Sequence, residues 1–323
     1  MNWRVIAALA AGLAVASCGG NPLNNTPECD SNPLAPCPPV PPPAPTPPPT
    51  EPPAPPVDPI PEALRGNLRS ATYSPEGGGT LSLVIDPLGT GGRSIPFKRD
   101  ASLDTDGYQA FTWQDTNTSR YYVALFDTSA KGAVSAGVVG SGQFTEMVWG
   151  STYAVDEAFS RPTDSGIATY SGSYAGLLNG GDPVDAALPP GDPAEPNRPF
   201  RTTGKVIINA DFNAPAPGGA RTGIEGSISG RRIVDTGTPL QDVFLQIATI
   251  NPDGTFGGTV VFRDTRTAGT YAGAFGGAGA SGVAGAVEMK PIPGADSILE
   301  RGAFVADLCA PGDPSPCPSS TAP

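Results

Sequence analysis

Apolar and polar residues alternate with a period of two along much of the second half of this chain, which is the period of a β-strand. Two segments show the alternation most clearly. One face of each is apolar: Val206, Ile208, Ala210 and Phe212 in the first, and Val243, Leu245 and Ile247 in the second. No helical period lasts for three turns outside the N-terminal leader, so the pattern predicts an all-β protein.

Eight strands are predicted between residues 161 and 308. They are expected near Ile167–Leu178, Gly204–Asn213, Gly223–Arg231, Asp242–Ile250, Thr255–Phe262, Gly269–Gly276, Gly282–Met289 and Gly302–Asp307. The sequence Asn251–Gly254 is a hairpin signal between the fourth and fifth strands, whereas residues 179–199 have no period and indicate a surface loop. Eight antiparallel strands can close a barrel that is filled by side chains or holds one small ligand. We therefore predict a C-terminal eight-stranded antiparallel β-barrel.

The stretch Gly269–Met289 predicts two short strands joined by a loop of small residues. Its large apolar side chains share one face at a period of two: Tyr271, Phe275, Val283, Val287 and Met289. Glycine weakens a strand interior, so the many glycines here indicate bends, bulges and close approach of backbones. We predict that this hairpin helps to close the barrel.

Residues 65–160 predict a smaller β unit ahead of the barrel. Strands are expected at Thr80–Asp86, Tyr121–Phe126, Gly132–Val139 and Phe144–Tyr153, with a turn at Asp127–Gly132.

Two groups of side chains in this unit are candidates for a site. The carboxylates of Asp100, Asp104 and Asp106 resemble a calcium loop but miss the EF-hand spacing and its terminal Glu, so a solvated acidic turn is expected. Aromatic residues also gather here: Trp113, Tyr121, Tyr122, Trp149 and Tyr153. Most of them are expected in a core, which leaves one or two for an exposed recognition patch.

Residues 1–17 predict an export leader, because Arg4 precedes an apolar run that is too short to cross a bilayer. The sequence Val15-Ala16-Ser17-Cys18 then resembles the bacterial lipobox, in which the Cys is lipidated and becomes N-terminal. No Asp follows Cys18, which resembles the outer-membrane sorting pattern of diderm bacteria. We predict that acyl chains on Cys18 anchor the protein to the outer membrane. A plain secretory leader with an incidental Cys is the alternative.

Residues 18–64 predict a disordered, proline-rich tether. Proline is the majority residue from Pro38 to Pro61, and such a run favours the extended polyproline II conformation. The position between a lipid anchor and a folded unit calls for a spacer. A ligand for a proline-binding module is the alternative.

Four cysteines remain besides Cys18, and an exported chain meets an oxidising compartment, so disulfides are expected. They are Cys29 and Cys37 before the proline run, and Cys309 and Cys317 in a Cys- and Pro-rich tail, 309–323. Three pairings are open. Two local loops, Cys29 with Cys37 and Cys309 with Cys317, are the first choice because short loops close at low entropic cost. Thiols in an oxidising space without CxxC spacing do not indicate a metal site.

The composition excludes several classes of function. The chain has no His and a net charge of −12, which removes Ser–His–Asp catalysis and His-ligated zinc or haem. Its acidic balance argues against a nucleic-acid partner. Tyrosine can bind iron without His, but no pocket for it is visible in a sequence. We predict no enzymatic activity, no cofactor and no metal.

One motif resembles enzyme chemistry. The sequence Ile233–Thr238 contains Asp235-Thr236-Gly237, which resembles the active-site loop of aspartic proteases. That mechanism needs two carboxylates that share a proton, hence two such loops. No second copy occurs in a matching context, so we expect a loop between the third and fourth barrel strands.

Several segments together resemble the C-terminal barrel of transferrin-binding protein B-like lipoproteins, and factor H-binding proteins share a similar barrel. The residues that carry the resemblance are Gly166, Ala168, Tyr170, Gly172 and Gly176 at its start, Gly273, Phe275 and Gly276 in the middle, and Gly302, Ala303 and Phe304 at its end. The sequence departs from the family at Gly279-Ala280-Ser281, where an acidic residue is usual. The match covers under half of the chain and implies a surface-exposed lipoprotein with a β-barrel. For some members it also implies export by a surface lipoprotein assembly modulator, and it carries no ligand site.

These observations predict a non-enzymatic, lipid-anchored outer-membrane protein that binds a protein or a small solute, with iron or haem compounds among the candidates. A host protein is one such partner. Two alternatives are a structural envelope lipoprotein without a specific ligand and an aspartic-type hydrolase. The sequence leaves open whether the barrel faces the cell exterior or the periplasm.

Overall fold

Strands make up nearly all of the secondary structure in the computed structural model, which describes residues 60–86, 92–116, 119–141, 148–163, 166–179, 198–213, 223–295, 297–310 and 317. The elements in chain order are α1 (Glu62–Arg65), β1 (Leu68–Ser74), η1 (Glu76–Gly78), β2 (Thr80–Ile85), β3 (Ile95–Arg99), η2 (Ala101–Leu103), β4 (Gln109–Trp113), β5 (Tyr122–Thr128), β6 (Val134–Ser141), β7 (Val148–Val155), β8 (Ile167–Leu178), β9 (Phe200–Asp211), β10 (Gly223–Ile233), β11 (Val243–Ala248), β12 (Thr255–Phe262), β13 (Thr267–Gly276), β14 (Gly282–Met289) and β15 (Glu300–Leu308).

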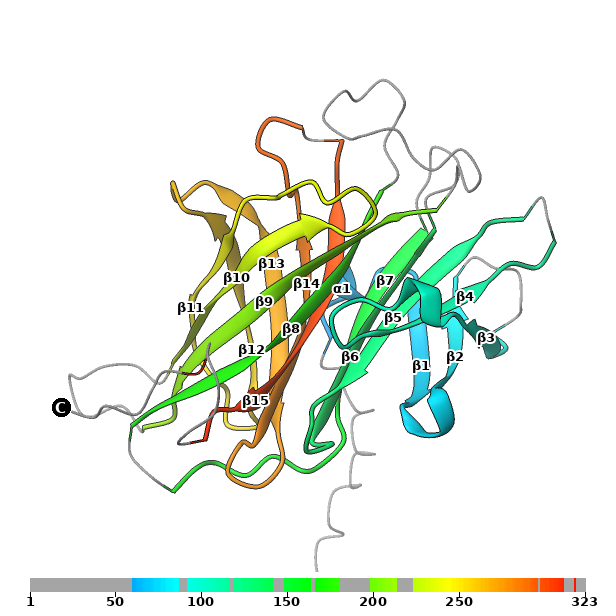
Figure 1. Cartoon of the computed structure of the whole chain (residues 1–323). Coiled ribbons are helices and arrows are strands. Elements are labelled where there is room, and N and C mark those ends of the chain that lie inside the picture. Colours follow the sequence, from blue (N-terminus) through cyan, green and yellow to red (C-terminus); the bar gives the residue numbers. More distant parts are fainter. Residues whose placement is uncertain are drawn as a thin grey trace, which may run out of the picture. The chain divides into compact units, whose positions relative to one another are not determined.

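Strands β8 to β15 form a closed barrel in which every strand pairs antiparallel with the next (Figure 1). The first and last strands close the ring, since β8 and β15 pair from Tyr170 opposite Leu308 to Leu178 opposite Glu300. All eight predicted strands are present, and the eight-stranded antiparallel barrel is confirmed. Strand β9 begins at Phe200, four residues earlier than the sequence pattern indicated.

The period-two pattern of the sequence fills the barrel. The side chains predicted to share the apolar face of Gly269–Met289 lie in one buried core inside the ring, together with Val206, Ile208 and Ala210 of β9. Burial of such faces drives folding because it removes apolar surface from water. The predicted inner face of both segments is therefore confirmed.

Ile247 is an exception, since the alternation predicted it inside and 70% of it is exposed. On β10, Ile224 pairs with Ala248 and Gly226 pairs with Leu245. Two residues of β11 therefore lie opposite one residue of β10, which is a β-bulge. The extra residue reverses the alternation and turns the Ile247 side chain outward.

Both predicted turns lie where the sequence placed them. Asn251–Gly254 joins β11 to β12, and Gly254 has a φ of +85°, which is a conformation that favours glycine. Asp127–Gly132 spans the end of β5 and the turn into β6.

Strands β1 to β7 form a separate antiparallel sheet in that order. The sequence predicted four of these strands and missed β1, β3 and β4. Strand β1 is largely polar, β3 contains Pro96, and β3 and β4 have only five residues each, so none shows a strong alternation. The last predicted strand begins at Val148 within the described part of the chain, and Phe144 lies outside it. The sheet surrounds a core of its own, which includes Leu83, Phe111 and Tyr122.

The folded unit begins earlier than expected. The tether was predicted to end at residue 64, yet Ile60 and Leu64 are buried and pack with residues of the sheet and the barrel. Residues 60–64 therefore belong to the folded unit.

Small side chains join the sheet to the barrel. The outward face of the barrel wall carries Ala175, Ala272, Ala274, Ala284, Ala286 and Ala303, and these pack in one buried cluster with Val123, Leu125, Val134 and Val138 of the sheet. Strand β6 lies beside β15 and β8 as a result (Figure 1). Alanine allows this close approach because it has no side chain beyond Cβ.

Candidate functional site

Aromatic side chains fill one end of the barrel. The ring of Phe275 lies at their centre, with centroids 4.9 Å from Phe212 and 5.2 Å from Phe256. The ring of Tyr170 lies 5.3 Å away, and its hydroxyl donates a hydrogen bond of 2.7 Å to the carbonyl of Ala280. This end of the barrel is therefore closed by packed rings.

A buried carboxylate fills the other end. Glu300 accepts hydrogen bonds from the Tyr174 hydroxyl at 2.8 Å and the Thr202 hydroxyl at 2.6 Å. Its second oxygen accepts from Nη2 of Arg231 at 2.5 Å, while Nη1 of Arg231 donates to the carbonyl of Gln241 at 2.7 Å. Burial, and secondly the charge of Glu300, raises the pKa of Tyr174. A charge so deeply buried persists in a fold only when it is paired.

The sequence allowed either a barrel filled by side chains or a barrel that holds one small ligand, and the two ends distinguish between these. The interior described here is filled by aromatic rings, aliphatic side chains and the Arg231–Glu300 pair, all of them buried. The barrel is therefore of the filled kind, and a small solute has no chamber among these side chains. Sequence reasoning missed the pair because its members are 69 residues apart.

The motif that resembles a protease loop lies between β10 and β11, as predicted. One oxygen of Asp235 accepts from Nη2 of Arg201 at 2.7 Å and from Nη2 of Arg198 at 3.0 Å, and the other accepts from the backbone N–H of Arg201 at 2.8 Å. Both oxygens thus bind donors that hold the loop to the start of β9.

The acidic turn also holds the sheet to the barrel. Asp100 accepts from the backbone N–H of Ser102, and Asp104 pairs with Arg99 at 2.6 Å. Asp106, in contrast, accepts a hydrogen bond of 2.7 Å from the hydroxyl of Thr203 on β9. The turn is partly exposed, as expected, but the contact with the barrel was not foreseen. Among the described residues, no group of three metal-binding side chains occurs.

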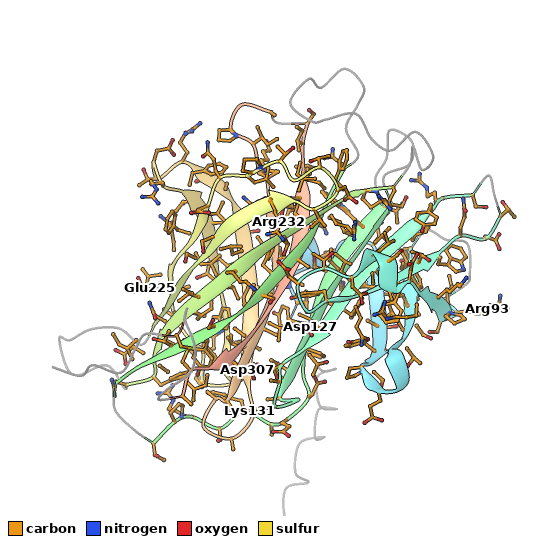
Figure 2. All side chains as sticks on the ribbon, in the orientation of Figure 1. Arg93, Asp127, Lys131, Glu225, Arg232 and Asp307 are labelled. Atoms are coloured by element: carbon orange, nitrogen blue, oxygen red, sulfur yellow. A yellow bond between two sulfur atoms is a disulfide. The ribbon has the colours of Figure 1, made fainter. Side chains whose placement is uncertain are left out.

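Two further carboxylates face the junction of sheet and barrel (Figure 2). Asp127 belongs to β5, and burial raises its pKa to about 7, with the charge of Asp307 on β15 acting in the same direction. Asp307 accepts from the backbone N–H of Ala130 at 2.9 Å. A Cβ atom on Gly107 would come within 3.2 Å of Asp127, so a glycine there leaves room for the carboxylate.

The aromatic residues of the sheet are mostly core, as predicted. Tyr122, Trp149 and Tyr153 are buried, while Trp113 and Tyr121 are partly buried. Trp149 has a specific role that the sequence did not indicate, since the guanidinium of Arg301 on β15 lies 4.6 Å from its ring centroid.

Two cavities lie beside the first and last strands of the sheet. One cavity of about 240 Å³ is lined by Ala71, Thr72 and Tyr73 of β1 and by Thr152, Tyr153 and Ala154 of β7, with Phe126 of β5 and Ser135 and Ala136 of β6 also in its lining. A second, of about 220 Å³, is lined by Leu68–Ala71 of β1, by Thr152, and by Ile60 and Arg65. Ala71 and Thr152 line both cavities, so the two lie end to end along one groove, which we call the β1–β7 groove.

The ends of the β1–β7 groove differ in charge. Asp156 lines the cavity at the Tyr73 end, whereas Arg65 and Arg69 line the cavity at the Leu68 end. Arg69 also pairs with the exposed Asp86 at 2.6 Å. Sequence reasoning missed the groove because its β1 wall is a polar strand without a clear period.

A third cavity, of about 310 Å³, lies at the aromatic end of the barrel. It is lined in part by Pro162, Ile167, Phe212 and Leu308. The Ile167 side chain is 72% exposed there. This cavity presents apolar surface but no open strand edge.

The cysteine predictions are tested only in part. Cys309 and Cys317 form a disulfide, which is the favoured pairing for these two residues. Cys18, Cys29 and Cys37 lie outside the described residues. Among the helices that the structure describes, none has the length and apolar character to cross a membrane.

Comparison with known proteins finds similarity in structure alone. No protein-family model matches the chain, and no curated protein matches it. A double mutant of transferrin binding protein B from Haemophilus parasuis is 16% identical with a TM-score of 0.39, over 70% of this chain and 40% of that one. Intact Ap-TbpB, with N and C lobes, is 12% identical with a TM-score of 0.38, over 71% and 52% of the two chains.

The haemoglobin receptor HpuA from Kingella denitrificans is 11% identical with a TM-score of 0.36, over 80% of this chain and 93% of that one. The chain thus spans 40% to 52% of the length of the two transferrin binding proteins. Two of these structures are of transferrin binding protein B, the protein that gives its name to the family whose barrel the sequence resembles.

Proposed function

We propose that this protein is a lipid-anchored outer-membrane protein that displays a rigid β scaffold and binds another protein on its surface. The anchor is Cys18, the proline-rich segment is the spacer, and the sheet and barrel are the scaffold. One observation carries the choice of a protein over a small solute. The barrel interior is filled by buried side chains, while the sheet leaves two strand edges beside open cavities.

The anchor and the display at the cell surface are tested in the cells that make the protein. We expect labelled palmitate to enter the wild-type chain and not the Cys18→Ser variant, and the wild-type chain to be removed by protease added to intact cells. Resistance to that protease, with normal labelling, would place the scaffold on the periplasmic side and contradict display at the surface.

The binding role is tested with the full, lipidated chain as bait. Chemical cross-linking on intact cells, with host serum as the source of candidates, should yield one discrete product that excess unlabelled protein abolishes. A chain that gives no competed product under these conditions would favour the structural envelope lipoprotein instead.

A further inference from the structure

We propose that the β1–β7 groove binds an extended segment of a partner polypeptide, which adds as an eighth strand antiparallel to both β1 and β7. The inference rests on the proposed function, because it names where and how a protein partner binds.

Strand direction is the first argument. In an antiparallel sheet with an odd number of strands, the first and last strands run in the same direction. The barrel has eight strands, so β8 and β15 close it antiparallel. The sheet has seven, and in the described residues β1 and β7 end it on either side without pairing as a ladder. One more antiparallel strand would give the sheet the closed form that the barrel already has.

The backbone contacts between the two edges support this reading. The two edges meet at one end. There the N–H of Asn67 donates to the carbonyl of Trp149 at 2.8 Å, and the Asn67 side chain accepts from the N–H of Trp149 at 3.2 Å. Further along, Ala71 and Thr152 line the two cavities instead. The strands are therefore fixed to each other at the Asn67 end and leave a groove beyond it.

Proteins use prolines and lysines, among other devices, to prevent strand addition at an edge. These two are missing from the described edges beyond the irregularity between Leu68 and Ser70 of β1. Ser70–Ser74 of β1 and Thr152–Val155 of β7 contain neither Pro nor Lys, and Val155 is 44% exposed. An edge of this kind recognises an extended backbone through main-chain hydrogen bonds. At about 3.4 Å per residue, Ser70–Ser74 would pair with about five residues.

Antiparallel pairing sets the direction of the segment, and the charges at the groove ends then indicate its chemistry. A strand antiparallel to β1 begins beside Tyr73 and Asp156 and ends beside Arg65 and Arg69. The segment should thus carry a positive charge at its N-terminal end and a negative charge at its C-terminal end. Matched charges of this kind add selectivity to backbone pairing.

The chain itself does not supply such a segment just ahead of the groove. Five of the ten residues from Thr50 to Pro59 are proline, and proline has no N–H to donate to a ladder. The occupant is therefore expected from another polypeptide.

The test uses the full chain in detergent and the synthetic peptide Lys-Thr-Val-Thr-Val-Glu. Two matched peptides serve as controls: one N-methylated at alternate residues, which can pair along one of its two edges but not along both, and one with the end charges exchanged. We expect the first peptide to bind best in fluorescence anisotropy and to slow hydrogen exchange in β1 and β7 alone. Equal binding of the N-methylated peptide, or protection elsewhere, would overturn the proposal.

A charge reversal in the protein tests the orientation. Asp156→Lys should weaken binding of the first peptide about tenfold and strengthen that of the charge-exchanged peptide. Glu225→Lys is the matched control, since Glu225 is an exposed carboxylate on barrel strand β10 (Figure 2) and should change neither. An equal effect of the two variants would overturn the proposal. The proposal would also be overturned if light scattering showed a dimer and hydrogen exchange placed the second copy in the groove.

The same reagents separate this inference from the proposed function. Suppose that a partner is cross-linked on cells and that neither the peptide nor Asp156→Lys reduces its cross-linking. This result would support protein binding and reject the groove as the binding site. Peptide binding in the groove without any competed product on cells would uphold the groove and reject the proposed function.

Discussion

The guanidinium of Arg301 lies over the indole ring of Trp149, 4.6 Å from its centroid. Arg301 belongs to barrel strand β15 and Trp149 to sheet strand β7, so this contact joins the two β structures. The same guanidinium donates to the carbonyl of Leu64 at 3.1 Å and pairs with Glu288. Burial lowers the pKa of Arg301, and its charge is satisfied by a ring face, a carbonyl and a carboxylate together.

Removing that side chain should loosen the junction. We expect Arg301→Ala to lower the free energy of unfolding by about 2–3 kcal/mol, because a stacked cation and a partly buried ion pair are lost together. Urea denaturation followed by tryptophan fluorescence measures it. Arg263→Ala is the matched control, since Arg263 lies 5.9 Å from the Phe244 ring on the exposed barrel wall and should cost under about 1 kcal/mol. Equal losses would contradict a special role for the junction.

The alanine seam between sheet and barrel should resist enlargement. Ala274→Leu is expected to lower the free energy of unfolding by about 1–3 kcal/mol, because the added atoms have no room against the sheet. Thr270→Leu is the matched control, since Thr270 lies on the same face of β13 but is exposed. Its effect should stay within about 0.5 kcal/mol. A tolerated leucine at position 274 would show that the two layers are not tightly packed.

The buried pair at the end of the barrel should respond differently to single and double changes. Glu300→Leu alone leaves the Arg231 guanidinium buried without its carboxylate and is expected to cost about 3–5 kcal/mol. The double variant Glu300→Leu with Arg231→Met should recover most of that loss, because no charge then remains buried. A double-mutant cycle by chemical denaturation measures the coupling. Additive losses would mean that the two side chains act independently.

Asp127 should make stability depend on pH. Its pKa is raised from 3.8 to about 7 in the folded chain, so between these values the folded state holds a proton that the unfolded state has lost. Stability from this group is therefore highest below pH 4 and falls as pH rises towards 7.

The Asp127→Asn variant tests that direction. It should flatten the decline between pH 4 and 7 and raise the free energy of unfolding above pH 7 by up to about 4 kcal/mol. Denaturation curves at pH 5, 6 and 8 measure the change. Asp253→Asn provides a contrast, because hydrogen bonds from Thr255 lower the pKa of Asp253 and its loss should give no stabilisation. A stability that rises with pH in the wild type and flattens in Asp127→Asn would reverse the sign.

Much of the fold could be read from the sequence because strand periodicity is a local property. The eight barrel strands, the Asn251–Gly254 turn and the inward face of Tyr271 and Phe275 all follow from spacing along a few residues. The orientation of Ile247 was not predicted because a bulge depends on the neighbouring strand. Strands β1, β3 and β4 were missed because short or polar strands show little alternation. The candidate site was not predicted at all, because the β1–β7 groove is lined by residues some eighty positions apart in the sequence, such as Ala71 and Thr152.

The sequence by itself determined that this is an all-β chain with a barrel of eight strands, and it predicts an export leader and a proline-rich spacer ahead of them. Only the tertiary structure decided what covers the second face of those strands. Alternation shows that the two faces of a strand differ, but it does not show what packs against the face with the smaller side chains. Ala272 and Ala274 look like weak strand residues in the sequence, yet they form the contact on which the sheet packs. The ion pair of Arg231 and Glu300 likewise exists only because barrel closure brings two distant strands together, with both side chains fully buried.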